Sequence, residues 1–171
     1  MNNAYGGSML AIRQAEEQDA RQIAEIYNHY IRHTKITFET ESVTIEEMAE
    51  RIRGKISRYD WFVAEDNGVI TGYAYYGEFR GRAAYHHTVE STVYVAESMM
   101  RMGIGSALYD RLIKSAGNKG FREMIAVIAL PNEGSVVLHG KKGFNEVGVF
   151  RGIGCKFGEY IDVIFMQKSL Y

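Results

Sequence analysis

The sequence is poor in the two residue types that would place it outside the class of ordinary folded domains. Its 171 residues include one proline, Pro131, and one cysteine, Cys155. A single cysteine cannot form a disulfide within the chain, so we expect a protein of the reducing cytoplasm. We expect Cys155 itself to be a small side chain that is buried or half-buried. With 18 glycines but no tripeptide period, the scarcity of proline excludes a collagen-like or proline-rich disordered chain.

An excess of charge of one sign is also missing. The 20 Lys and Arg residues face 21 Asp and Glu residues, which leaves a formal net charge of −1. Without a basic block the chain lacks the electrostatic footprint of a nucleic-acid-binding protein. No apolar run approaches the roughly 18 residues of a membrane span. We therefore expect neither a nucleic acid nor a membrane as a partner.

The chain shows no internal boundary. Residues 1–8 lack the basic and apolar regions of a signal peptide, and we predict that they are a flexible leader or an expression remnant. The remaining residues, 9–171, contain no linker and are predicted to form one domain. The composition, 46% apolar and 24% charged, is typical of a soluble globular domain.

Hydrophobic periodicity predicts alternating strands and helices. Helices are expected near residues 19–33, 44–58, 103–119 and 132–142. Strands are expected near 10–13, 61–65, 69–79, 88–95, 124–130, 146–151 and 160–167. Thr44 and Glu47 form a capping box, and Asn67-Gly68 is a strong hairpin signal. These elements predict an α/β domain with a mixed twisted sheet of about seven strands flanked by about four helices.

The most informative local segment runs from Arg101 to Ser106, between a predicted strand and a predicted helix. Gly103 and Gly105 allow the backbone to approach a ligand closely, and the N–H groups of the first helical turn have no intrahelical partners. Such donors suit a pyrophosphate, although a Gly-x-Gly pair is equally typical of a tight turn. The position of Leu108 lacks the third glycine or alanine of a dinucleotide fingerprint, and no Walker lysine follows Gly105.

A second segment extends this pattern towards the C-terminus. It follows N-x-x-[AS]-x-x-L-[YH]-x-K-x-G-F through Asn132, Ser135, Leu138, His139, Lys141, Gly143 and Phe144. With the Arg-x-Gly-x-Gly turn, the segment resembles the GCN5-related N-acetyltransferase (GNAT) superfamily, which binds acetyl-CoA. Over about residues 10–168 the chain further resembles the phosphinothricin and methionine sulfoximine/sulfone acetyltransferase branch, through segments 24–28, 37–39, 72–74, 88–95, 128–132 and 157–163.

The resemblance implies a single GNAT-like domain that uses acetyl-CoA to acetylate the α-amine of a small amino-acid analogue, and a homodimer. It also implies that the strand before the glycine turn parts from its neighbour to bind pantetheine. The implied acetyl-CoA contacts are Val93, Tyr94 and Val95 for pantetheine, Arg101, Met102, Gly103, Ile104, Gly105 and Ser106 for pyrophosphate, and Asn132, Ser135 and Lys141 elsewhere. At Met100 the chain departs from the Gln or Arg usual in the superfamily.

The chemistry of amine acetylation sets further requirements. An α-amine is mostly protonated at neutral pH and must lose a proton before it attacks a thioester, so a base is needed. Glu90 is the candidate, and a surface glutamate paired with a cation is the alternative. A backbone N–H near Val95 can stabilise the oxyanion. His139 stands where many superfamily members have tyrosine, and is either an acid for the departing thiolate or only a contact to acetyl-CoA.

The acceptor is expected to bind near the loop that precedes Glu90. Arginine suits a substrate carboxylate, so Arg80 or Arg82 is the candidate partner, and a solvated loop with two ordinary arginines is the alternative. The side-chain pocket is predicted to include Phe38, Phe79 and Tyr85. His86 and His87, if extended, point to opposite sides, and we predict no metal site.

Two other functions remain open from the residues alone. The acceptor can be a different amine, such as a peptide N-terminus or a polyamine, although an arginine-bearing loop disfavours a polycation. The chain can also be a non-catalytic acyl-CoA-binding module. The combination of Glu90 with a substrate loop favours an enzyme, because a pure sensor needs neither.

Overall fold

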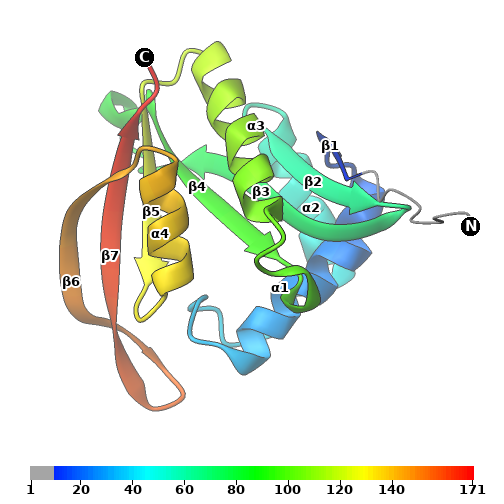
Figure 1. Ribbon diagram of the computed structural model, residues 1–171, viewed down its shortest axis with the longest axis horizontal. Helices are drawn as coiled ribbons and strands as arrows, with labels where there is room; N and C mark the ends of the chain where they lie inside the picture. The colour runs from blue at the N-terminus through cyan, green and yellow to red at the C-terminus, as the bar shows by residue number, and fades with distance from the viewer. Residues whose placement is uncertain (1–9) are drawn as a thin grey trace, which may run out of the picture.

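A computed structural model describes residues 10–171 (Figure 1), so the predicted leader lies outside the described residues. The strands are β1 (Ala11–Gln14), β2 (Trp61–Asp66), β3 (Val69–Glu78), β4 (Thr88–Val95), β5 (Glu123–Ala129), β6 (Asn145–Lys156) and β7 (Glu159–Ser169). The helices are α1 (Ala20–His33), α2 (Ile45–Ile56), α3 (Ile104–Asn118) and α4 (Glu133–Lys141), with short 3₁₀ turns at Glu17–Asp19, Ala83–Tyr85 and Glu97–Met99. The predicted order of strands and α-helices is confirmed.

All seven strands belong to one mixed sheet in the order β1-β2-β3-β4-β5-β7-β6. The β4–β5 pair is parallel, and the other neighbouring pairs are antiparallel. The connection between β4 and β5 passes through α3, as a parallel crossover requires. The predicted α/β class with a mixed sheet is confirmed.

Helices cover both faces of the sheet, with α1 and α2 on one face and α3 and α4 on the other (Figure 1). The alternation of side chains along β2 explains why both faces are apolar. Trp61 and Val63 belong to the buried cluster beneath α1 and α2, whereas Phe62 and Ala64 belong to the cluster beneath α3. No helix within residues 10–171 is long and apolar enough to cross a membrane.

Two local signals produce the predicted geometry. The Thr44 hydroxyl accepts a hydrogen bond from the Glu47 N–H at 3.1 Å, and the Glu47 carboxylate accepts from the Thr44 N–H at 2.8 Å. Asn67 and Gly68, with φ of 51° and 83°, form the tight turn between β2 and β3. Both positive φ values match the turn that Asn-Gly favours in hairpins.

The C-terminal hairpin is longer than the sequence pattern predicts. Strand β6 continues to Lys156, five residues beyond the predicted end at Arg151, because irregular pairing between Phe150 and Gly154 interrupts the period-2 pattern. The expectation for Cys155 is wrong, since it is exposed while its neighbour Lys156 is buried. Alternation along the strand turns Lys156 inward, where its ammonium donates to the Thr37 carbonyl at 2.7 Å.

Candidate active site

Strands β4 and β5 part halfway along their length. Their parallel pairing runs from Thr88 opposite Glu123 to Ser91 opposite Ala126. Beyond this point β4 pairs only with β3, and β5 pairs only with β7, within residues 10–171. The facing edges of residues 92–95 and 127–129 therefore lack a strand partner. An extended ligand with amide groups can form hydrogen bonds with such edges.

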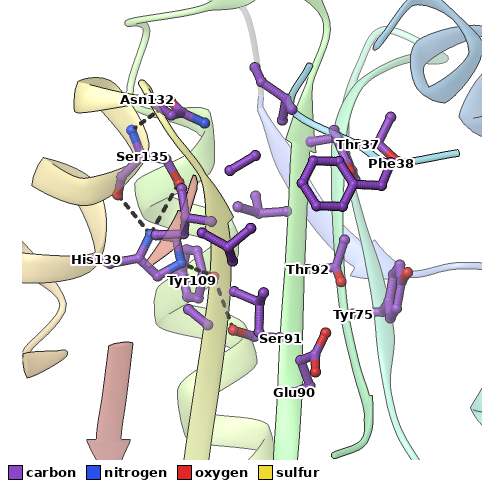
Figure 2. Close-up of a pocket in the computed structure, with 18 of the residues that line it drawn as sticks. Thr37, Phe38, Tyr75, Glu90, Ser91, Thr92, Tyr109, Asn132, Ser135 and His139 are labelled. Carbon is purple, nitrogen blue, oxygen red and sulfur yellow. Dashed lines mark hydrogen bonds between the residues drawn. The ribbon is translucent and has the colours of Figure 1, made fainter. Parts of the chain in front are cut away.

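A cavity of about 260 Å³ lies where the two strands part (Figure 2). Because neighbouring residues of a strand point to opposite faces, Glu90 and Ser91 extend to opposite sides of the sheet. The lining residues come from both sides. They are Tyr27, Ile36, Thr37, Phe38, Tyr75, Glu90, Ser91, Thr92, Val93, Tyr94, Tyr109, Ala126, Val127, Ile128, Ala129, Asn132, Ser135, His139 and Val163.

The glycine turn before α3 presents free backbone donors. Arg101 and Gly103 have φ of 64° and 81°, so the chain reverses sharply before the helix. The Ala107 N–H donates to the Gly103 carbonyl at 3.0 Å, and α3 has no side-chain cap. The N–H groups of the preceding residues 104–106 thus have no intrahelical acceptor. Free N–H groups at a helix N-terminus, together with the helix dipole, are the geometry that favours an anion.

Gly103 and Gly105 serve different purposes in this turn. Gly103 adopts a left-handed conformation, and a Cβ added there would meet no atom within 4 Å. A Cβ added at Gly105 would lie 3.3 Å from Leu138 Cδ2 and 3.6 Å from Val95 Cγ2. Gly105 therefore allows α3 to begin close to the open end of β4. An anion site beside unpaired strand edges fits a molecule with a pyrophosphate followed by an amide-containing chain.

Glu90 lies half-buried at the lower end of the cavity, below Thr92 in the view of Figure 2. Burial raises the pKa of its carboxyl group, while the positive charges of Lys55 and Arg80 act in the opposite direction. The net effect is an increase, which brings a glutamate closer to the pKa of a base that works near neutral pH.

On the other side of the cavity, His139 belongs to a hydrogen-bonded group that spans three elements. Its Nδ1 lies 2.7 Å from the Ser135 carbonyl, which can only accept, so Nδ1 carries the proton. Its Nε2 then accepts from the Tyr109 hydroxyl at 2.5 Å, and the Ser91 hydroxyl lies 3.1 Å from the same tyrosine oxygen. Burial lowers the pKa of His139, which favours the neutral ring.

Tyr109 is a cavity residue that the sequence did not reveal. It stands on α3 four residues after Gly105, in a run whose apolar spacing predicts only core positions. The group that it forms joins residues 91, 109, 135 and 139, and no local motif links them. Knowledge that α4 packs beside α3 is needed to recognise it.

The remaining predicted acetyl-CoA contacts are placed unevenly. Val93, Tyr94, Asn132 and Ser135 line the cavity (Figure 2 labels Asn132 and Ser135). Asn132 also caps α4, because its Oδ1 accepts from the Ser135 N–H at 3.2 Å. By contrast, Arg101, Met102 and Lys141 are exposed and do not line the cavity.

The predicted acceptor residues divide into two groups. Phe38 lines the cavity, whereas the four residues of the loop after β3 lie outside it, beyond Glu90. In that loop the Phe79 ring lies 5.9 Å from the Tyr85 ring, and the Arg80 guanidinium lies 5.1 Å from the Phe79 ring. The side chains of Arg80 and Arg82 are exposed, and neither forms an ion pair with a residue of the described chain.

The expectation that His86 and His87 point to opposite sides is wrong. They follow a 3₁₀ turn rather than lying in an extended strand, and their rings are 4.0 Å apart. In the described part of the chain, no three His, Cys, Asp or Glu side chains come together as a metal site.

Comparisons with known proteins agree with this architecture. The sequence model of the family described as "Acetyltransferase (GNAT) domain" matches residues 12–165. The chain is 43% identical to the phosphinothricin N-acetyltransferase of Streptomyces viridochromogenes, over 94% of this chain and 87% of the relative. It is 36% identical to the L-methionine sulfoximine/L-methionine sulfone acetyltransferase of Salmonella typhimurium, over 94% of this chain and 95% of the relative.

A solved structure gives the same result. The GNAT superfamily phosphinothricin acetyltransferase of Sinorhizobium meliloti, in complex with AcCoA, superposes with a TM-score of 0.91. The two chains are 36% identical, and the match covers 94% of this chain and 88% of the other. The parted strands, the glycine turn and these similarities lead to one conclusion: the chain belongs to the GNAT family of acetyltransferases.

Proposed function

We propose that this enzyme transfers the acetyl group of acetyl-CoA directly to the α-amine of a small amino-acid analogue of the phosphinothricin or methionine sulfoximine/sulfone type. The observation that carries the proposal is the half-buried Glu90 carboxylate in a cavity between parted strands. The names of two relatives, at 43% and 36% identity, support the substrate class.

We propose that the residues around the strand gap hold acetyl-CoA. The N–H groups of residues 104–106 bind its pyrophosphate, and the free edge of Val93 to Val95 binds pantetheine. Asn132 and Ser135, at the start of α4, contact acetyl-CoA within the cavity. Arg101, Met102 and Lys141 contact the part of acetyl-CoA that lies outside the cavity. When bound, acetyl-CoA supplies the acetyl group as a thioester, and the remaining steps fall to side chains of this protein.

Glu90 is the proposed general base. It takes a proton from the substrate ammonium, which frees the nitrogen lone pair for attack. Its raised pKa, caused by burial, makes the carboxylate a better proton acceptor than an exposed glutamate. The backbone N–H near Val95 is the proposed donor to the oxygen that gains charge.

On the leaving-group side, Tyr109 is the proposed hydrogen-bond donor to the departing sulfur. It lines the cavity, and its single hydroxyl proton, which His139 Nε2 accepts at 2.5 Å in this structure, turns from the imidazole to the sulfur as the C–S bond breaks. Since the Nδ1 proton of His139 is directed to the Ser135 carbonyl, we assign His139 mainly to orienting Tyr109. A direct acid role for His139 is the alternative.

The acceptor carboxylate is proposed to bind Arg80 or Arg82, whose guanidinium groups are free of ion pairs in the described chain. Phe38 forms the cavity wall, and Phe79 with Tyr85 forms the outer part of the side-chain pocket. In this proposal the acceptor binds on the Glu90 side of the sheet, and acetyl-CoA binds between the parted strands.

Release of free thiol from acetyl-CoA tests the proposal. The panel consists of phosphinothricin, methionine sulfoximine, methionine sulfone, a peptide with a free N-terminus and a polyamine. We expect release with the three analogues and its near loss in Glu90→Gln at pH 7. Release only with the peptide or polyamine overturns the substrate class. Thermal stabilisation by CoA without release on any amine shows a non-catalytic binding module.

We further propose that the chain forms a homodimer in the cytoplasm. Exposed apolar side chains along the β6–β7 hairpin, among them Phe150, Ile153 and Tyr160, support a buried contact there. The lack of a second cysteine is compatible with a reducing compartment. Light scattering after gel filtration tests the oligomeric state, and a monomer at micromolar concentration overturns it.

A further inference from the structure

The ammonium group of Lys55 occupies a space that a missing side chain leaves open on the sheet. Lys55 stands near the end of α2, and its Nζ lies 2.6 Å from the point that a Cβ on Gly77 would occupy. Its Cε lies 3.7 Å from that point, and no other atom comes within 4 Å. A glycine at position 77 is therefore what allows this lysine to rest against β3.

The same face of the sheet carries the proposed base. Gly77 and Glu90 are direct partners in the antiparallel β3–β4 ladder, so their side-chain directions lie on one face. The next pair on this face is Tyr75 and Thr92, both of which line the cavity. The Lys55 ammonium lies 4.9 Å from the centre of the Tyr75 ring. It is thus held between an aromatic wall of the cavity and the backbone opposite Glu90.

Lys55 has no other charge to neutralise. It is half-buried and forms no ion pair within residues 10–171. Burial lowers its pKa, whereas the charge of Glu90 raises it. The charged or titratable groups that face Glu90 are Lys55 from α2, Arg80 from the loop after β3, and Tyr75 from β3. Arg51, one turn before Lys55, is bound to Glu39 at 2.7 Å.

We propose that Lys55 is a positioning residue that keeps the Glu90 carboxylate ionised and ready to accept a proton at the start of each catalytic cycle. This inference rests on the proposed role of Glu90 as the base. A carboxylate half-buried in a cavity tends to retain a proton, and a nearby ammonium opposes that tendency. The Lys55 ammonium rests against Tyr75 and Gly77 and does not line the cavity, so it acts on the base through its charge and not by contact with the substrate.

The pH profile of kcat/KM tests the inference with acetyl-CoA and methionine sulfone. In Lys55→Met we expect the acidic limb of the kcat/KM profile to move to higher pH by about half a unit to one unit. At a pH below this limb, kcat/KM should therefore be about three- to tenfold lower than in the wild type. The rate at high pH is unchanged, because Glu90 is ionised there in both proteins. Lys55→Arg keeps the positive charge, so we expect its acidic limb to stay at the wild-type pH. Arg53→Met, on the exposed side of α2, is the matched control.

A second variant pair tests the space over Gly77. Gly77→Ala introduces a Cβ whose only close neighbour is the Lys55 ammonium, so we expect a limb shift in the same direction as in Lys55→Met. In the double variant Lys55→Met/Gly77→Ala the added methyl should have no further effect on the limb. If Gly77→Ala shifts the limb equally in the wild type and in Lys55→Met, the coupling between Gly77 and Lys55 is overturned.

A direct titration separates this inference from the proposed function. Carboxyl carbons of labelled glutamate are followed by NMR, and Glu90→Gln identifies the Glu90 signal. We expect Lys55→Met to titrate Glu90 at higher pH than wild type, whether or not any acceptor is acetylated. An unchanged Glu90 titration in a folded Lys55→Met protein overturns the inference. An active Glu90→Gln enzyme instead overturns Glu90 as the base.

Discussion

The Tyr109 hydroxyl donates a 2.5 Å hydrogen bond to Nε2 of His139, and this contact joins α3 to α4 at the cavity, which both side chains line. The ring of His139 is fixed from the opposite side by the Ser135 carbonyl, 2.7 Å from Nδ1. The orientation of the tyrosine thus depends on a histidine 30 positions away in the sequence. A helix that reads as apolar core supplies a polar group to the site.

Removal of this hydroxyl should affect the chemical step more than binding. In Tyr109→Phe we expect kcat to fall by about a hundredfold while the affinity for CoA stays within about twofold, because a donor to the leaving group acts in the transition state. Steady-state kinetics and CoA titration check the result. Tyr171→Phe, which alters an exposed ring, is the control. A wild-type kcat in Tyr109→Phe contradicts the assignment.

The buried imidazole should make folding sensitive to acid. Burial lowers the folded-state pKa of His139 below the ordinary value of about 6.5, so the unfolded chain binds the proton more readily. The free energy of unfolding should therefore decrease as the pH falls below about 6.5. Urea unfolding at pH 7.5 and pH 5.5 measures this decrease. The decrease should be smaller in His139→Gln, and an equal decrease in both proteins contradicts the prediction.

Alanine substitutions at Gly103 and at Gly54 should change the stability of the protein in opposite directions. Gly103 has φ of 81°, so Gly103→Ala should lower stability by about 1 kcal/mol and weaken CoA binding by about tenfold. Gly54 lies within α2 with open space around it, so Gly54→Ala should raise stability by about 0.5–1 kcal/mol and leave CoA binding unchanged. Thermal unfolding and calorimetric titration measure both quantities.

Strand β6 should influence the acceptor through Phe38. A Cβ at Gly154 would come within 2.3 Å of the Phe38 ring, whereas a Cβ at Gly148 on the same strand would meet no atom within 4 Å. We expect Gly154→Ala to displace the ring and raise KM for the acceptor about tenfold, with little change in KM for acetyl-CoA. Gly148→Ala is the matched control. Equal kinetics in the two variants show that Phe38 does not shape the acceptor site.

Several features of the site could be predicted because they depend on neighbours in the chain. The capping box at Thr44, the turn at Asn67-Gly68 and the glycine turn at Gly103 are short-range geometry, and each appears where its residues predict it. The position of Glu90 on a strand beside the glycine turn is also a local fact. The resemblance to the GNAT family added the role of each segment.

Other features escaped prediction because they join distant segments. Irregular pairing hid the second half of β6 and, with it, the buried Lys156 that binds the Thr37 carbonyl. The expectation of an extended chain at His86 and His87 failed because a 3₁₀ turn precedes them. Lys55 reads in the sequence as an ordinary helix cation, and only its contact with Gly77 singles it out.

The sequence alone determined the α/β class, the order of the elements and the glycine turn before α3, since periodicity and backbone preferences act over a few residues. Its scarcity of proline, cysteine and net charge also excluded several classes of protein. Tertiary structure decided where β4 parts from β5, that Tyr109 meets His139, and that Lys55 of α2 rests against Gly77, the partner of Glu90 in the β3–β4 ladder. These relationships follow from the packing of helices on both faces of the sheet, which brings together residues that no local pattern connects.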